Sequence, residues 1–537
     1  MPTPGEPSRQ RLPSTSAFSL RPFMFALPRL VPRRRSAWLL AAVFVLLGGL
    51  PARPAHAQQQ QDRPAPSALP DSGAAITYEE AVRLALERNY QLRQARNTVT
   101  SQSISVDQNR AQFYPNLSLS ASGRRDFGRN FSQSQGEILS QSSSGANFEA
   151  RSQINLFNGF RDDATLDEAQ ARTQAAGNTL QRTRRDVVFQ VLQRYIQLAQ
   201  NRALVDVRRQ QLELRRQQLE QTQAQIEVGE KAPSAVYQLQ ADVAAARQEL
   251  MQAQRNADIS KTELVRLLVL DPFGSYSFKT SALDDELDTA TAPAPYQLDQ
   301  LLERAYDQRE DLHAQQASIA ADEQNVRAAR GGFWPRLDLS FNYGSNWNSL
   351  SRRAIPGTGT PPRQGRITPA DGGEPIMIDI PGTGEPPETR QTAFFDQLDA
   401  RRGGGLSVSL SYTLFDRFQT RYNVEQAQVQ LENARFQKEL LRQDIAVEAR
   451  QALVEYRNAR TSLEVATQRL EAARQAQEAA QERYRLGAAT YVELADANTS
   501  LAQAQSDRVS ARYDLLLQQQ RLDYVTGTLD PEAPLAR

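Results

Sequence analysis

Two acidic residues, Glu493 and Asp496, form the pair whose type and spacing could do chemistry in this chain. Residues three apart on a helix share a face, so both carboxylates would point the same way. Clustered carboxylates attract cations and repel one another, and such a face could select or hold cations. The plain alternative is a solvated helix surface that carries two ordinary acids.

Other kinds of reactive site have few residues available. The chain has no cysteine and only two histidines, His56 and His313, which excludes disulfides, thiolate metal sites and cysteine nucleophiles. It contains no phosphate-binding loop, dinucleotide-binding motif or nucleophile elbow. We therefore expect no enzyme activity, no metal site and no cofactor.

The N-terminal residues are typical of an export signal. Arginines precede an apolar run from Trp38 to Leu50, and Ala55-His56-Ala57 matches a cleavage site. The run is too short to cross a membrane as a helix, and no later stretch reaches about 18 apolar residues. The sequence thus predicts a signal peptide over 1–57 and an exported protein that is periplasmic, secreted or an outer-membrane β-barrel.

Removing the signal reverses the charge. Residues 1–57 hold eight arginines and one glutamate, a net of +7, so the mature chain would carry 1 − 7 = −6. Nucleic-acid-binding proteins present a basic face, so we expect no nucleic-acid partner.

The mature chain contains two copies of one unit. Pro115, in Phe-Tyr-Pro-Asn-Leu, recurs as Pro335, in Phe-Trp-Pro-Arg-Leu, at an offset of 335 − 115 = 220. Leu156-Phe-Asn-Gly-Phe160 recurs as Leu414-Phe-Asp-Arg-Phe418 at an offset of 414 − 156 = 258, which also relates Gly229 to Gly487. The second copy therefore carries 258 − 220 = 38 extra residues.

These offsets divide the chain. We predict a disordered segment (58–75), a first repeat (76–279), a linker (280–295), a second repeat (296–530) and a C-terminal tail (531–537). The extra residues lie within 345–404, whose proline and glycine content is typical of an irregular surface loop. Between two strand tips, it would be extracellular.

Each repeat has the same predicted order of elements: helix, strand, loop, strand and two long helices joined by a tight turn. Pro115 and Pro335 end a helix and start a strand. Apolar residues alternate with polar ones over 337–343 and 406–414, and more weakly over 117–121 and 154–156. Each segment has roughly the ten residues of a membrane-spanning β-strand.

Aromatic residues gather where predicted strands meet predicted helices. Both hairpins would place these junctions at one end, which favours the interfacial aromatic girdle of a membrane barrel. A core cap under a soluble sheet is the alternative. The residues are Phe113, Tyr114, Phe157, Phe160, Phe333, Trp334, Phe415 and Phe418.

The helices are long and have a coiled-coil repeat. No proline interrupts 160–228, a span of roughly 100 Å if helical. Val191, Leu198, Val205 and Leu212 are seven residues apart, and the second copy keeps the register except at Gln477. A seven-residue repeat indicates coiled-coil packing.

Four strands cannot close a barrel alone, because about eight is the practical minimum, and an open edge is not tolerated in lipid. Two chains would close a barrel only at this minimum size, and three would give 4 × 3 = 12 strands. We therefore predict a mainly α fold with a membrane β-barrel. Each chain would contribute four β-strands, which close as a 12-stranded barrel in a trimer. A long α-helical coiled-coil barrel would adjoin it.

Together, the duplication, the strand and helix starts, and the turn from Tyr484 through Gly487 to 491–497 resemble the TolC-type outer-membrane efflux and secretion channels. The resemblance covers 76–530. It implies a homotrimeric passive duct through the outer membrane and periplasm, in contact with outer-membrane lipids, a periplasmic adaptor protein and an inner-membrane transporter. It also implies that Glu493 and Asp496 face the pore as a gate, and that the turns at Gly229, Gly487 and Tyr484 dock the adaptor.

Two departures from the family pattern concern the gate. Ala235 takes a position that is often acidic, and Ala489 takes that of an arginine that ties the gate shut in some members. The rival interpretation is a soluble periplasmic coiled-coil scaffold or adaptor protein. Such a protein would not need duplicated strands of membrane length.

Overall fold

A computed structural model of the protein describes residues 75–132, 136–140, 142–227, 234–280, 296–355, 363–367, 374–380 and 388–530. Several expectations fall outside the described residues: the signal peptide, positions 58–74, Gly229, most of the 280–295 linker, parts of the 345–404 insertion and the 531–537 tail.

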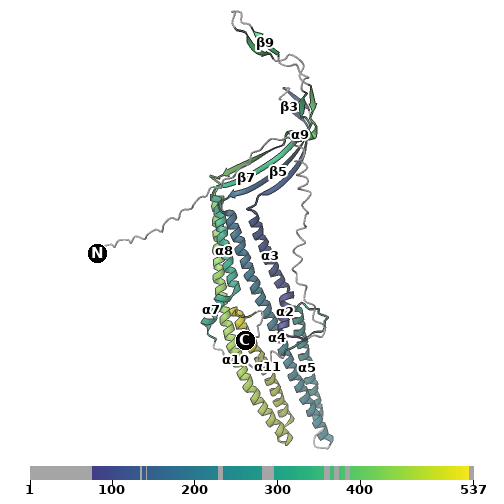
Figure 1. The fold of residues 1–537 in the computed structure, drawn as a ribbon. Coiled ribbons are helices and arrows are strands. Elements are labelled where there is room, and N and C mark those ends of the chain that lie inside the picture. Colours follow the sequence, from purple (N-terminus) through teal and green to yellow (C-terminus); the bar gives the residue numbers. More distant parts are fainter. Residues whose placement is uncertain are drawn as a thin grey trace, which may run out of the picture. The chain divides into compact units, whose positions relative to one another are not determined.

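The first repeat has two helices, two long strands and two long helices, with short strands beside them (Figure 1). The main elements are α2 (Tyr78–Arg88), α3 (Tyr90–Ala111), β2 (Asn116–Asp126), β5 (Ser143–Phe157), α4 (Arg161–Glu227) and α5 (Ser234–Leu267). The short strands are β1 (Ala75–Ile76), which pairs with β6 (Ser277–Phe278), and β3 (Arg129–Ser132), which pairs with β4 (Glu137–Ser140).

The second repeat has the same order with a longer insertion. Its main elements are α7 (Leu298–Gln308), α8 (Glu310–Arg330), η1 (Gly331–Phe333), β7 (Arg336–Asn348), β12 (Gly403–Ser411), α10 (Gln419–Arg485) and α11 (Tyr491–Thr526). The insertion holds β8 (Arg352–Ala354), β9 (Arg363–Ile367), β10 (Ile376–Ile380), β11 (Thr389–Gln391) and α9 (Phe394–Ala400). Helix α7 starts 298 − 78 = 220 residues after α2, and α10 starts 419 − 161 = 258 after α4.

The first long helix of each repeat, α4 and α10, begins beside a similar side-chain contact. Asn158 accepts hydrogen bonds at Oδ1 from the backbone nitrogens of Arg161 (3.1 Å) and Asp162 (3.3 Å), which satisfies helix N–H groups that lack partners. In the second repeat Asp416 accepts from the nitrogen of Thr420 at 2.8 Å. Each of these residues lies just before the start of a 67-residue helix, roughly 100 Å long.

The helix expected before each strand is two helices. Asn89 leaves the helical region (φ −57°, ψ 129°), ends α2 and caps α3 by accepting from the nitrogens of Gln91 and Leu92. Arg309 occupies the equivalent break between α7 and α8. A single non-helical residue leaves the hydrophobic pattern almost unchanged, so the periodicity does not reveal either break.

The four long strands form one antiparallel sheet in the order β12-β7-β5-β2. The central pair, β5 and β7, joins the two repeats. Leu339 lies opposite Ile154 and Val408, whereas the next row places Ser340 between Gln153 and Ser407. The sheet thus has one apolar and one polar face.

One strand is shorter than its alternation indicated. The period-two pattern continues to Leu414, but β12 ends at Ser411. Ser411 pairs with Arg336, the first residue of β7, and the preceding Pro335 has no N–H with which to extend the ladder.

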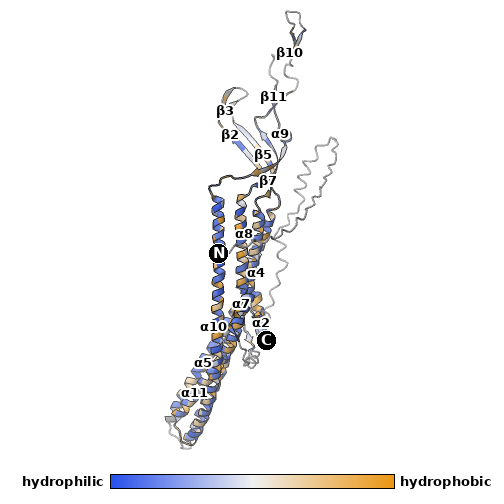
Figure 2. Ribbon diagram, turned by 90° about the vertical axis from the view of Figure 1, so that its left-hand side faces the viewer, coloured by the Kyte–Doolittle hydropathy of each residue, from blue (hydrophilic) through white to orange (hydrophobic). Residues whose placement is uncertain are grey.

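The helices pack side by side below the sheet. α4 contacts α3, α5 and α8, and α10 contacts α8 and α11. In Figure 2 the long helices alternate hydrophilic and hydrophobic residues along their length. The heptad positions Val191, Leu198, Val205 and Leu212 are all buried, as coiled-coil packing requires. The main core lies where α2, β1 and β6 meet α4.

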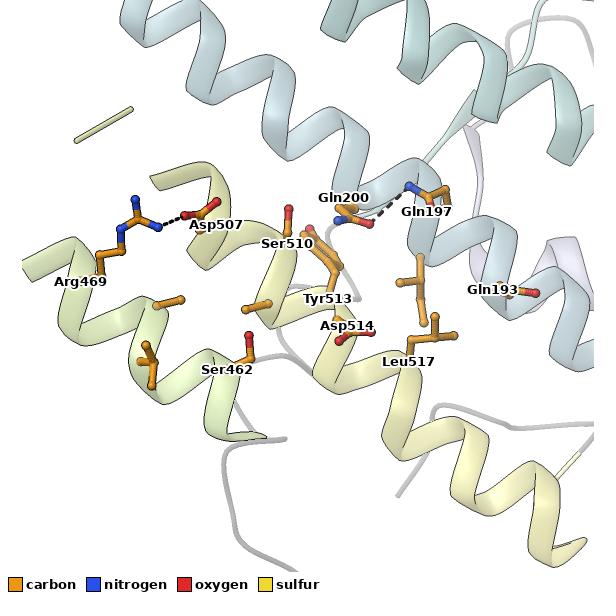
Figure 3. A pocket seen from close by; sticks show the side chains of 14 residues that line it. Gln193, Gln197, Gln200, Ser462, Arg469, Asp507, Ser510, Tyr513, Asp514 and Leu517 are labelled. Carbon is orange, nitrogen blue, oxygen red and sulfur yellow. Dashed lines mark hydrogen bonds and ion pairs between the residues drawn. The ribbon is translucent and has the colours of Figure 1, made fainter. Parts of the chain in front are cut away.

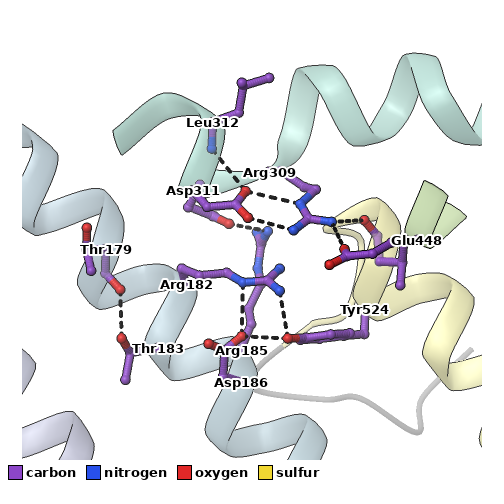
Figure 4. A network of polar contacts seen from close by, with 12 residues as sticks. Thr179, Arg182, Thr183, Arg185, Asp186, Arg309, Asp311, Leu312, Glu448 and Tyr524 are labelled. Atoms are coloured by element: carbon purple, nitrogen blue, oxygen red, sulfur yellow. Dashed lines mark hydrogen bonds and ion pairs between the residues drawn. The ribbon is translucent and has the colours of Figure 1, made fainter. Parts of the chain in front are cut away.

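A polar network ties the repeats together beside the break at Arg309, which is buried (Figure 4). Arg309 donates to both carboxylate oxygens of Asp311 (3.1 and 2.6 Å) and to Glu448 of α10 (2.6 Å). Burial alone would raise the pKa of Asp311, but its hydrogen bonds and charge interaction with Arg309 hold that pKa below its ordinary value. Nearby, Arg182 of α4 donates to the Tyr524 hydroxyl of α11 at 2.6 Å.

Candidate functional site: the ends of the long helices

The turn between α10 and α11 depends on the backbone of Gly487. Its φ is +72°, in the left-handed region, although a Cβ there would meet no atom within 4 Å. Glycine is therefore needed for its conformation and not for space. The turn closes with hydrogen bonds from Gly487 N to Tyr484 O (3.1 Å) and from Ala488 N to Arg483 O (2.8 Å).

Glu493 belongs to the start of α11 as well as to the acidic pair. Thr490 caps the helix by accepting from Glu493 N at 3.3 Å, and its hydroxyl also reaches the Glu493 carboxylate. Arg483 of α10 lies 3.3 Å from the same carboxylate. Glu493 thus has a charge partner across the turn that the sequence-based interpretation did not include.

Asp496 and Glu493 are both exposed, while Leu494 and Asn498 are buried on the packed side of α11. The two carboxylates therefore share the open face, as their spacing predicted. In the first repeat, Gln238 stands at the position that corresponds to Asp496 and donates to Asp242 at 3.2 Å.

A second cluster holds the start of α11 against the first repeat, and sequence reasoning missed it. The Tyr491 hydroxyl donates to Asp242 of α5. Burial, and then the hydrogen bond to Asp242, raise the pKa of Tyr491 above its ordinary value, so the phenol keeps its proton. The Tyr484 ring lies edge-on to that of Tyr491 at 6.2 Å.

Arg215 of α4 completes this cluster. Its side chain is 6% exposed, and Nη2 donates to the Ala495 carbonyl (3.5 Å) and the Thr499 hydroxyl (3.4 Å) of α11. We call Tyr491, Asp242 and Arg215 the α11 clamp. The family pattern places an acidic residue at the position of Ala235. Asp242 lies seven residues later, one heptad farther along α5, so the pattern does not point to it.

The exception to the heptad register, Gln477, also has a partner. It is buried and donates to Asn498 of α11 at 3.1 Å. A buried polar pair of this kind fixes the register of two packed helices.

The aromatic residues at the strand–helix junctions are mostly exposed, and Phe157 is the partly buried member. The Phe157 ring contacts Phe160 at 5.2 Å and Trp334 at 6.5 Å. Junctions of the two repeats therefore meet at the same end of the sheet. β2 and β7 begin directly after Pro115 and Pro335.

A groove of about 580 Å³ runs between α4, α10 and α11, away from the turn (Figure 3). Arg469 and Asp507 form an ion pair of 2.6 Å on its wall. Its lining mixes polar side chains with apolar ones such as Ile196, Val465 and Leu517, as expected of a seam between the helical hairpins.

The described residues include no cluster of histidine or acidic side chains that could hold a metal ion. Nor do they include a helix long and apolar enough to cross a membrane.

Two of three comparisons with known proteins find matches. A model of the family described as outer membrane efflux protein matches residues 81–268 and 301–528. A search of curated proteins finds no match.

Among solved structures, VceC of Vibrio cholerae is 17% identical with a TM-score of 0.63, and the match covers 84% of this chain and 96% of VceC. CmeC of Campylobacter jejuni is 15% identical with a TM-score of 0.64, covering 86% and 90%. The Neisseria gonorrhoeae channel MtrE, in its open state, is 17% identical with a TM-score of 0.60, covering 84% and 88%.

Proposed function

Because this chain belongs to the outer membrane efflux protein family, a family of non-enzymatic outer-membrane channels that extend into the periplasm, we propose that it is the passive exit duct of a tripartite efflux pump or a type I secretion system. The cargo would pass through the duct while an inner-membrane transporter supplies the energy. A periplasmic adaptor protein would connect the two. A soluble scaffold or adaptor, the earlier alternative, does not fit membership of this family.

The observation that carries the proposal is the sheet with one apolar face, one polar face and two open edges. Within the described residues, β2 and β12 each pair with one strand only. Open edges cannot face lipid, so β12 of one copy would pair with β2 of the next. Three copies would close a 12-stranded barrel with the polar face lining the lumen, above a cylinder of long helices. Cleavage after 57 and an extracellular 345–404 insertion belong to the same proposal.

The far ends of the long helices would form the periplasmic mouth. There, Glu493 and Asp496 of three chains would place 2 × 3 = 6 carboxylates around the axis. We expect the α11 clamp to favour a closed mouth, because it holds α11 against α4 and α5. The turns at Gly229, Gly487 and Tyr484 would meet the adaptor.

The test is the oligomeric state of the mature chain in mild detergent. Light scattering and electron microscopy should give a three-fold particle of three chains, and outer-membrane fractions should give heat-modifiable trimer bands. A stable monomer would contradict the closure of the sheet between copies, and therefore the proposed duct.

A further inference from the structure

Helix α9, in the insertion of the second repeat, lies on the apolar face of the sheet. Its Phe394 ring contacts Trp347 of β7 at 5.6 Å and Phe148 of β5 at 6.3 Å. In the ladder Trp347 lies opposite Ala146 and Phe148 opposite Ser345. These positions continue the row that contains Leu339 and Phe341, so α9 covers the face that the proposed barrel turns outward.

The position of α9 is fixed by hydrogen bonds, not by the aromatic contacts alone. Gln397 is 1% exposed and accepts at Oε1 from the backbone nitrogen of Asn348 at 3.0 Å. Its amide nitrogen donates to the Thr392 carbonyl at 2.9 Å, and Ser345 donates to the Leu398 carbonyl at 2.7 Å. The helix is therefore an integral part of this end of the sheet.

The height of α9 matches the thickness of a membrane. Ten residues separate Leu337, beside the junction aromatics, from Trp347, which is roughly 33 Å along a strand. A strand tilt of about 40° reduces this to about 25 Å, the height of the apolar band of a membrane barrel. Trp347 and α9 thus lie where the apolar band would end on the extracellular side, and Phe395 is 79% exposed there.

Arginines lie immediately beyond this aromatic layer. Arg353 of β8 lies directly opposite Arg390 of β11, and like charges in that position repel. Arg401 ends α9 and donates to Ser351 at 2.8 Å, while Arg402 pairs with Asp399 at 2.9 Å. Over 345–355 and 388–402 there are five arginines and three carboxylates, a net of 5 − 3 = +2, in a mature chain expected to be negative overall.

We propose that α9 and these arginines form a binding site for a phosphorylated lipid of the outer leaflet, with Phe395 and Trp347 against its acyl chains and Arg353 and Arg390 on its phosphate. The site rests on the proposed function, because only a membrane barrel brings lipid to this face. A phosphate between Arg353 and Arg390 would turn their repulsion into two charge-assisted contacts. Aromatic side chains at headgroup level are the usual anchors of such an interface.

The first experiment measures depth, using the tryptophans as probes. The chain has three, and Trp38 lies in the signal peptide. Trp334→Phe therefore leaves Trp347 as the fluorophore of the mature chain, and Trp347→Phe leaves Trp334. The mature protein is reconstituted into vesicles whose lipids carry bromine near the headgroup or near the chain end. Both tryptophans should be quenched more strongly by the shallow bromines.

This experiment separates the inference from the proposed function. If bromolipids quench Trp334 but not Trp347, the sheet enters the bilayer while α9 stays outside it, which overturns the inference alone. If neither tryptophan is quenched, the membrane barrel itself is wrong.

The second experiment measures lipid binding to the intact mature oligomer in detergent by native mass spectrometry. The probe is bisphosphorylated lipid A, compared with the same lipid after removal of its phosphates. Arg353→Ala with Arg390→Ala should weaken binding of the phosphorylated lipid by roughly 25-fold, since each arginine contributes about 5-fold. Arg353→Lys with Arg390→Lys should retain most of the binding because it keeps both charges.

The matched control is Arg363→Ala with Arg366→Ala on β9, which removes two arginines from a separate hairpin. It should bind like the parent protein. Equal binding by the parent and the Arg353/Arg390 double-alanine variant, or no preference for the phosphorylated lipid, would overturn the site. Displacement of the lipid by millimolar inorganic phosphate would assign the arginines to a free anion instead.

Discussion

Tyr491→Phe removes one oxygen atom from the contact between α11 and α5 and leaves the ring in place. The lost interaction is the hydrogen bond from the Tyr491 hydroxyl to the Asp242 carboxylate. The ring contact with Tyr484 at 6.2 Å and the Arg215 contacts to α11 remain. The substitution therefore weakens the α11 clamp without dismantling the end of the helix.

The magnitude follows from the kind of bond. A hydrogen bond to a charged group contributes about 1.5–3 kcal/mol net, and the half-buried position of Tyr491 favours the lower part of that range. If three chains open together, the closed state loses about 5 kcal/mol, which shifts the closed–open equilibrium by roughly 10³-fold or more. The raised pKa of Tyr491 means that this link is present below pH ~10, the ordinary tyrosine pKa, and is lost only as pH rises beyond it.

The assay is single-channel conductance in planar bilayers. Tyr491→Phe should open the channel far more often or more widely than the parent. The control is Tyr237→Phe, which makes the same chemical change on α5 at a side chain that is 73% exposed, and it should conduct like the parent. Parental conductance in Tyr491→Phe, with trimers intact, would show that the clamp does not hold the mouth closed.

Three further outcomes are expected. Glu493→Ala with Asp496→Ala should reduce cation selectivity and block by multivalent cations from the periplasmic side, measured by reversal potential and blocker titration; unchanged values would place these carboxylates away from the pore. Arg309→Met should lower the thermal stability of the trimer by about 3 kcal/mol per chain, because it leaves the Asp311 carboxylate without its buried partner. The pKa of Asp311 is lowered in the folded protein. The stability that the Arg309–Asp311 ion pair contributes to the parent protein should therefore persist above pH ~4 and be lost in more acidic solution. Deletion of 357–386 should leave trimer assembly intact, because loop length contributes little free energy, and loss of the trimer on gel filtration would make the segment structural.

Much of the fold could be predicted because repetition made the signal visible twice. The offsets of 220 and 258 residues in the sequence are also the offsets between α2 and α7 and between α4 and α10. The strands were predicted from their alternation, and the face that holds Leu339 is apolar as expected. The heptad positions are buried as predicted, because the seven-residue spacing of apolar residues places them on the packed side of the helix.

The missed features depend on single residues and on contacts between distant segments. The breaks at Asn89 and Arg309 each involve one residue, too little to alter the periodicity. Tyr491 and Asp242 are 249 positions apart, and no local pattern links them. The Arg483–Glu493 ion pair crosses a tight turn, which spacing along one helix could not indicate.

The pairing of β5 with β7 has a consequence for biogenesis. Gln153 meets Ser340 across 187 residues of chain, so neither repeat can complete the sheet alone, and the ladder forms only after both halves have been exported. Until then, and afterwards at β2 and β12, each chain presents unpaired strand edges with exposed leucines to water. Such edges template aggregation. Yield should therefore depend on how quickly newly exported copies find one another, and periplasmic chaperones that shield strand edges should limit the rate at which channels appear.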